Sequence, residues 1–509
     1  MRREWRELSS LAWPAALAAL LFALLDVVDT AMLGWIGVSD MAGAALGSTI
    51  FAALVALPTG MMTVLAMLIA SSQRGRGQQT LRPLTAIAAV ASLLLGSIAS
   101  AALLVLALLL PRLGFESELA MACQRYLLWR APVVAVELLF VGLWALLEGL
   151  GDTRRPLLVG ALCVTANVVL NALLIPGRLV PALRGVAGAA VATNIALGIG
   201  ALAIGWALWR RREWRRDDTP TFERAAGLRV HAARFVNLGW PLGVNTLLDL
   251  TGGLTLSMLV AGYGSTIAAG HAVLSKLIAL GAALAQGTGV AGLTLVARAT
   301  GAGDHARRKL DVHGALLVQS ALGALAAIAV WTYGERWLAL FTTDRGVLDA
   351  GRPLLGLCSL ILAIEGLALV AARLLEGMGR TRSILVATLL FDVALGLPAA
   401  LVLGAQVGWA GCYLVWLARA LFKLVFFARR LPVALPTARQ LRAAIAAPLQ
   451  FPLLVGPSWA PAAVRAQPRL DQTYAGALLD AELFGERALA RPRPRHKRYQ
   501  PWSLPPPDD

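Results

Sequence analysis

The sequence predicts an all-α polytopic membrane protein in which twelve transmembrane helices form two pseudo-symmetric lobes of six helices each. Its composition, the spacing of its apolar segments and an internal repeat predict this fold. Of the 509 residues, 58% are hydrophobic and only 15% are charged, with a mean hydropathy of +0.69. Because about a quarter of the residues of a soluble domain are charged, this composition excludes the soluble globular class.

Windows of about 20 apolar residues, the length needed to cross a bilayer as a helix, mark the membrane spans. The first window is too long for the apolar core of a signal peptide and leads directly into another, so we expect it to be retained. The predicted spans are 10–35, 44–70, 84–110, 120–147, 156–175, 186–209, 235–262, 268–296, 313–333, 352–376, 383–403 and 408–430.

Basic residues gather in alternate connections between these spans, for example Arg74 and Arg76, then Arg154 and Arg155. By the positive-inside rule that side is cytoplasmic, which predicts an inner-membrane protein with both termini in the cytoplasm. The net charge of +17 is then explained by basic loops that orient the protein in the membrane and face anionic lipid. No nucleic-acid partner is predicted.

An internal repeat divides the chain into two parallel halves. Pro14 and Gly60 recur 227 residues later as Pro241 and Gly287, and EGLGDTRRPL after the fourth span matches EGMGRTRSIL after the tenth. We predict an N-terminal lobe, a cytoplasmic interlobe loop, a C-terminal lobe and a Pro/Arg-rich, mostly disordered cytoplasmic tail that contacts lipid. Their predicted limits are 1–209, 210–234, 235–432 and 433–509.

Carboxylates inside the apolar spans are the first candidates for function, because a buried charge costs about 2.5–3.5 kcal/mol on insertion scales. Asp26 and Asp29 lie in the second half of the first span, and Asp249 lies in the seventh. The alternative for Asp29 is a helix-end residue that is hydrogen-bonded by Thr30, and for Asp26 a structural or helper role.

Several motifs together resemble the multidrug and toxic compound extrusion (MATE) transporters, most of all their DinF branch. They are LAWP and DVVDTAMLGWIG in the first span, EGLGDTRRPL after the fourth, ANVVLNALLI in the fifth and GVAGAAVAT in the sixth. The resemblance covers residues 8–430. It implies two six-helix lobes that export drugs while H+ or Na+ flows inward, and it implies a monomer with no cofactor.

In DinF-like proteins the cation site lies in the first lobe, and the resemblance places it here on Asp29, Asn167, Asn171 and Thr193. Asn167 and Asn171 are four residues apart and therefore share one helical face. Asn171 stands where the family has a second acid. Because a hard cation prefers several charged oxygens, one matched carboxylate, with Asp26 nearby, favours H+ over Na+.

In the NorM branch the acids lie in the second lobe, and Asp249 and Glu365 match those positions, with Lys276 and Asp392 as further intramembrane charges. Two interpretations remain open. These groups form the coupling site, or they form a salt-bridged network, with Lys276 as the expected partner, that maintains the shape of the cavity.

Two prolines inside predicted spans, Pro14 and Pro241, each remove a helical hydrogen bond and so permit bending. The resemblance implies that bending of the first helix is part of transport. Inert kinks are the alternative.

The predicted function is antiport, that is, export of amphipathic and mainly cationic organic compounds in exchange for H+ or Na+. Export of one dedicated metabolite, flipping of a lipid-linked precursor and a non-transporting scaffold are the alternatives. Enzymatic activity is not predicted, because there is no GxxxxGK[ST] loop and the histidines are scattered. The four cysteines lack CxxC spacing, so we predict no metal site.

Overall fold

The computed structural model describes residues 2–34, 38–73, 81–112, 117–211, 221–341 and 345–432, and over these residues it contains helices and no β-strand. The predicted tail, 433–509, lies outside the described residues, as does the side chain of Asp26. Eleven described segments are long and apolar enough to cross a membrane. Together with α1 they correspond one to one to the twelve predicted spans.

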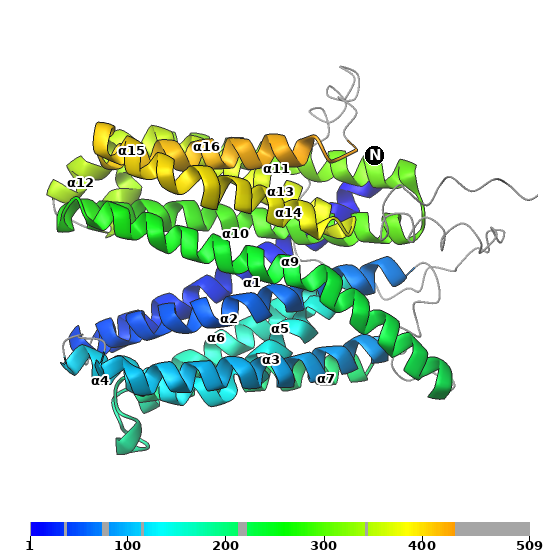
Figure 1. Cartoon of the computed structure of the whole chain (residues 1–509), viewed down its shortest axis with the longest axis horizontal. Helices are drawn as coiled ribbons and strands as arrows, with labels where there is room; N and C mark the ends of the chain where they lie inside the picture. Colours follow the sequence, from blue (N-terminus) through cyan, green and yellow to red (C-terminus); the bar gives the residue numbers. More distant parts are fainter. Residues whose placement is uncertain are drawn as a thin grey trace, which may run out of the picture. The chain divides into compact units, whose positions relative to one another are not determined.

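The first six spans are formed by seven helices, because α4 and α5 together make the fourth span (Figure 1). The helices are α1 (Arg2–Gly34), α2 (Val38–Ser72), α3 (Leu81–Leu109), α4 (Ser117–Arg130), α5 (Val134–Gly149), α6 (Arg154–Leu174) and α7 (Val186–Trp209).

The remaining six spans include two composite ones, in which short segments join end to end. The segments are α9 (Thr221–Ala261), α10 (Ser265–Gly301), α11 (His305–Phe341), α12 (Arg345–Gly351), α13 (Leu355–Gly377), α14 (Thr381–Thr388), the π-helix η6 (Leu389–Gly396), α15 (Leu397–Val407) and α16 (Trp409–Ala428).

The predicted interlobe loop, 210–234, is shorter in the structure, because α9 begins at Thr221. The predicted start of the seventh span rested on hydropathy, which detects only the part of a helix that lies in lipid. Leu228, Arg229 and Val230 are exposed on the first turns of α9. Helical hydrogen bonding continues through them without an apolar environment.

The fourth and tenth spans are each interrupted by a single 3-10 turn at a proline. The turns are Ala131–Val133, which contains Pro132, and Arg352–Leu354, which contains Pro353. Proline lacks the amide hydrogen that a continuous helix would use, so both repeats break the same span. In the first lobe this break sets the direction of Arg130, the last residue of α4.

The repeated EGxG motif ends the helices of spans four and ten with the same turn. Gly151 has φ +75° and Gly379 has φ +77°, a left-handed conformation that glycine adopts without steric cost. A side chain at either position would strain the turn, which explains why both copies carry glycine.

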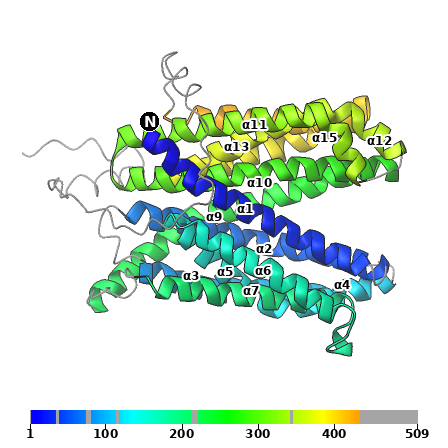
Figure 2. The ribbon, with the colours of Figure 1, turned by 180° about the vertical axis from the view of Figure 1, so that it is seen from behind.

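The two lobes meet at two equivalent helix crossings, α2 against α9 and α1 against α10 (Figures 1 and 2). A Cβ atom on Gly60 of α2 would lie 2.6 Å from the carbonyl oxygen of Leu242 on α9. A Cβ on Gly287 of α10 would lie 2.4 Å from the carbonyl oxygen of Ala12 on α1. These glycines, matched in the sequence repeat, therefore allow the backbones of the two lobes to approach closely.

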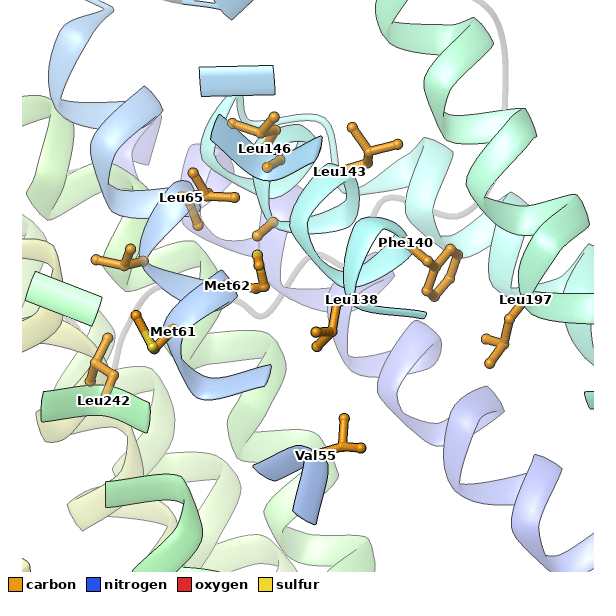
Figure 3. Packing of buried hydrophobic residues seen from close by; sticks show 14 of the residues in the cluster. Val55, Met61, Met62, Leu65, Leu138, Phe140, Leu143, Leu146, Leu197 and Leu242 are labelled. Atoms are coloured by element: carbon orange, nitrogen blue, oxygen red, sulfur yellow. The ribbon is translucent and has the colours of Figure 1, made fainter. Parts of the chain in front are cut away.

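The hydrophobic core continues from the first lobe into the second. Figure 3 shows Met62 and Leu65 of α2 beside Leu138 and Leu146 of α5, with Leu242 of α9 near Met61. The same buried cluster includes residues of α10 and α13, namely Leu293, Val296 and Leu374.

Polar contacts join the lobes at the end where the Arg-rich connections lie. Arg307 Nη2 on α11 lies 3.0 Å from Glu7 Oε2 on α1. Thr294 Oγ1 on α10 donates to the carbonyl oxygen of Glu148 on α5, at 3.1 Å. The lobes are therefore in contact at the end that the sequence predicts to be cytoplasmic.

Replacement of Gly287 by leucine tests the crossing of α1 and α10. The new side chain would overlap backbone atoms of α1, so we expect a loss of about 1–3 kcal/mol of stability. The measurement is the midpoint temperature of unfolding of the purified protein in detergent. Gly314→Leu is the matched control, because a Cβ there meets no described atom within 4 Å. Equal midpoints for the two variants would contradict this account of the crossing.

Candidate functional site

Three side chains from two helices of the first lobe, α6 and α7, converge around Asp29 of α1. Asn171 Nδ2 on α6 donates to Asp29 Oδ1 at 2.5 Å, and Thr193 Oγ1 on α7 donates to Asp29 Oδ2 at 2.9 Å. Asn167 Nδ2 donates to Thr193 Oγ1 at 3.2 Å. The structure thus brings together the four residues that the resemblance grouped, although their role is not tested by this placement.

The local sequence explains how α6 presents two amides to one carboxylate. Asn167 and Asn171 are one helical turn apart on the face of α6 directed at α1 and α7, and both are fully buried. Asn171 Nδ2 also donates to Asn167 Oδ1 at 3.0 Å, which orients both amides. An ionised Asp29 would therefore be held by donors that are already positioned, which lowers the cost of its burial.

The same cluster can also hold a protonated Asp29. The hydroxyl of Thr193 lies 3.0 Å from the carbonyl oxygen of Ala189, one turn earlier on α7. If Asp29 carried a proton on Oδ2, it could donate to Thr193, whose own hydrogen would then go to Ala189. In addition, Asn171 Oδ1 is buried without a hydrogen-bond partner. Both protonation states of the carboxyl group thus find partners with little rearrangement.

Arg130 is a buried cation close to this cluster that the sequence analysis did not single out. Its Nη2 donates to Glu137 Oε2 at 2.6 Å and its Nη1 donates to Asn194 Oδ1 at 2.7 Å. It lies within electrostatic range of Asp29. The sequence could have indicated Arg130, because an arginine in the middle of the predicted span 120–147 needs a buried partner. One of its partners, Asn194, is the residue after Thr193.

In the second lobe, Asp249, Glu365 and Asp392 surround one guanidinium group, that of Arg419 on α16. Arg419 donates to Asp249 Oδ1 at 2.6 Å, to Glu365 Oε1 at 2.9 Å and to Asp392 Oδ1 at 2.9 Å. Lys423 Nζ, one turn later, lies 2.9 Å from Asp249 Oδ1 and 3.1 Å from Asp392 Oδ2. We call these five residues the second-lobe network.

The expected pairing of these acids with Lys276 is wrong. Lys276 is exposed on α10 and makes no ion pair with the three acids, all of which the structure describes. The actual partners, Arg419 and Lys423, share a face of the last span because they are four residues apart. In the sequence, two bases four residues apart inside the apolar window 408–430 could have indicated that this helix face meets buried acids.

A cavity of about 520 Å³ opens beside the second-lobe network. Its walls come from α9, α10, η6, α15 and α16, and Asp249, Asp392 and Arg419 lie in them. Most of the remaining lining is apolar, and it includes Leu254, Phe391, Leu397 and Trp416. A volume of this size is typical of sites for drug-sized molecules.

The two prolines lie at the interlobe crossings. Pro14 is buried in α1 between Ala12 and Ala16, the residues that face Gly287 of α10. Pro241 is buried in α9 beside the contacts of Leu242 with α2. A bend at either proline would therefore move one lobe against the other. Bending itself stays a prediction.

A bundle of apolar helices in two lobes, with charges kept in its interior, defines a multi-pass membrane transporter. Within that class, the sequence model of the MatE family matches residues 14–173 and 241–402, one match in each lobe, beginning at Pro14 and at Pro241. The chain belongs to this family, which is a family of transporters and not of enzymes.

Individual relatives agree with this assignment. The multidrug resistance protein NorM of Photobacterium profundum is 27% identical over 406 residues, which cover 79% of this chain and 88% of the relative. The multidrug resistance protein MdtK of Pectobacterium atrosepticum is 27% identical over 407 residues, with coverages of 78% and 87%. The crystal structure of the eukaryotic MATE transporter AtDTX14 is similar in fold, with a TM-score of 0.76 at 17% identity over 87% of this chain and 98% of that one.

The family and the two-lobed fold predicted from the sequence are thus confirmed, and the chain is homologous to multidrug efflux transporters. The finer assignment to the DinF branch stays a prediction, because these relatives are NorM and MdtK proteins.

Arg130→Gln tests the buried ion pair of the first lobe. Removal of one partner leaves Glu137 charged and unpaired, so we expect a loss of about 3–5 kcal/mol of stability, read from thermal unfolding in detergent. The double variant Arg130→Gln/Glu137→Gln should recover most of it. Arg352→Gln, whose partner Glu335 is 62% exposed, should change stability by less than about 1 kcal/mol. A melting curve of Arg130→Gln that matches the wild type would refute the assigned burial cost.

Proposed function

We propose that this protein is an H+-driven antiporter that exports amphipathic organic cations, with Asp29 as the proton carrier. Its homology to multidrug resistance proteins supports export of drug-like compounds. The observation that carries the coupling proposal is the cluster around Asp29, in which one carboxylate inside the membrane is surrounded by neutral groups that serve both of its protonation states.

The chemistry of this cluster favours a proton over Na+. A metal cation needs several oxygen ligands around it, whereas Asn171 and Thr193 direct an N–H and an O–H group at Asp29.

We propose that protonation of Asp29 is transmitted through α1. Neutralisation weakens the charge-assisted hydrogen bonds from Asn171 and Thr193, which loosens the contact of α1 with α6 and α7. Pro14 lies on the same helix at its crossing with α10, so a bend there would alter the contact between the lobes. Deprotonation toward the cytoplasm would then return α1 to its starting position.

The proposal also includes the membrane in which the protein lies and its oligomeric state. The Arg-rich connections support an inner-membrane protein with both termini in the cytoplasm. We propose that it works as a monomer, because each lobe contains its own charged cluster and the duplicated chain supplies both lobes. Basic residues of the tail, 433–509, would contact anionic lipid.

Gradients imposed separately on proteoliposomes test the coupling ion. We expect ethidium to move against its own gradient when a pH gradient is imposed and to stay at the leak rate of protein-free vesicles when only a Na+ gradient is imposed. The signal is ethidium fluorescence. Accumulation driven by Na+ alone, at equal pH on both sides, would overturn proton coupling.

Asp29→Asn removes the proposed carrier while it keeps the size of the side chain. We expect proton counterflow driven by ethidium to fall to the level of protein-free vesicles, measured with an internal pH dye. The matched control is Asp349→Asn, which removes a carboxylate that is 71% exposed and should transport as the wild type does. Normal counterflow in Asp29→Asn would exclude Asp29 as the carrier.

A further inference from the structure

We infer that Arg419 is a tethered counter-ion, which occupies Asp249 while the second-lobe cavity is empty and which the positive charge of a hydrophobic cargo displaces. This inference rests on the proposed export of organic cations and adds the residue that sets affinity for them. It is carried by the charge balance of the second-lobe network, the exposure of Asp249 and the position of Arg419 on the cavity wall.

The charge balance leaves room for one additional positive charge. The network contains three carboxylates and two bases, so one negative charge is in excess when all five groups are ionised. The second oxygen of Glu365, Oε2, is buried without a hydrogen-bond partner. A monocation that enters the network would therefore complete its neutralisation rather than overload it.

Asp249 is the carboxylate that cargo can reach. Its side chain is 39% exposed, compared with 7% for Asp392, and it lines the cavity together with Arg419. Cargo in the cavity therefore meets Asp249 and Arg419 at the same point. A positive charge at that point attracts the carboxylate and repels the guanidinium, so cargo competes with Arg419 for Asp249 Oδ1, which also accepts from Lys423 Nζ at 2.9 Å.

Release of Asp249 by Arg419 is a small rearrangement, because the network has redundant contacts. Arg419 would keep Glu365 at 2.9 Å and Asp392 at 2.9 Å, and Lys423 would keep Asp392 at 3.1 Å. Asp392 lies in the π-helix η6, a type of helical irregularity that is frequent at functional sites. No buried charge is left without a partner when cargo takes the place of Arg419 on Asp249.

The cavity wall indicates the class of cation. Leu254, Phe391 and Leu397 offer apolar contact, and the indole ring of Trp416 can lie against a delocalised positive charge. An extended, hydrophobic monocation fits this lining and a volume of about 520 Å³. A small hydrated ion would gain nothing from the apolar walls.

Binding of tetraphenylphosphonium to the purified protein in detergent tests the competition. Arg419→Gln removes the tethered charge, so we expect the dissociation constant to fall about tenfold. Asp249→Asn should raise it about tenfold in the wild type and about a hundredfold in the Arg419→Gln background, because Arg419 has nothing to compete for once Asp249 has lost its charge. Lys276→Gln removes a positive charge from the same lobe but outside the network, and we expect it to bind as the wild type does.

Equal or weaker binding by Arg419→Gln, in a sample that is monodisperse on size exclusion, would overturn the inference. If that variant aggregates, Arg419→Lys decides, because an ammonium group cannot bridge three carboxylates in this geometry. About threefold tighter binding would support the competition, and unchanged binding would overturn it. Absence of binding in all forms would overturn this inference together with the cationic cargo. Wild-type binding without any tightening in the variants would overturn this inference alone.

Discussion

The compensation of buried charge determines how this bundle is assembled. A charged side chain in lipid surroundings needs a partner from the same protein, and Asp29, Arg130 and Arg419 each find partners on another helix or across a break in one. Asp29 takes its donors from α6 and α7, Arg130 reaches Glu137 across the break of the fourth span, and Arg419 brings α16 to α9, α13 and η6. The rotation of these helices about their axes follows from those contacts.

The two lobes share one arrangement of helices but compensate their buried charges with different side chains. The repeated glycines, Gly60 and Gly287, and the repeated EGxG turns preserve the helix crossings in both halves. The polar interiors, in contrast, have diverged. The first lobe holds Asp29 among neutral donors with the ion pair of Arg130 and Glu137 nearby, and the second lobe holds three acids between two bases. Under the proposed function, this divergence separates proton carriage in one lobe from cargo recognition in the other.

Much of the fold and half of the site could be predicted. Hydropathy located the twelve spans, and the spacing of 227 residues identified equivalent positions, including both interlobe glycines. Asn167 and Asn171 could be assigned to one helical face from their spacing, although their meeting with Asp29 and Thr193 came only from family resemblance. The partners of the second-lobe acids were mispredicted, because the spacing of Arg419 and Lys423 places them on one helix face but does not say which helices that face meets.

The sequence by itself determined that the chain crosses the membrane and that it is duplicated. Membrane crossing is a local property, since a helix in lipid satisfies its own backbone hydrogen bonds and needs only a sufficient run of apolar residues. The duplication is visible as matching residues 227 positions apart, without any knowledge of contacts. Only the tertiary structure decided which buried charges meet. That choice depends on the direction each helix face takes in the bundle, which directs Lys276 away from the acids and Arg419 into the middle of them. Contacts between distant segments set those directions, and no single window of sequence contains them.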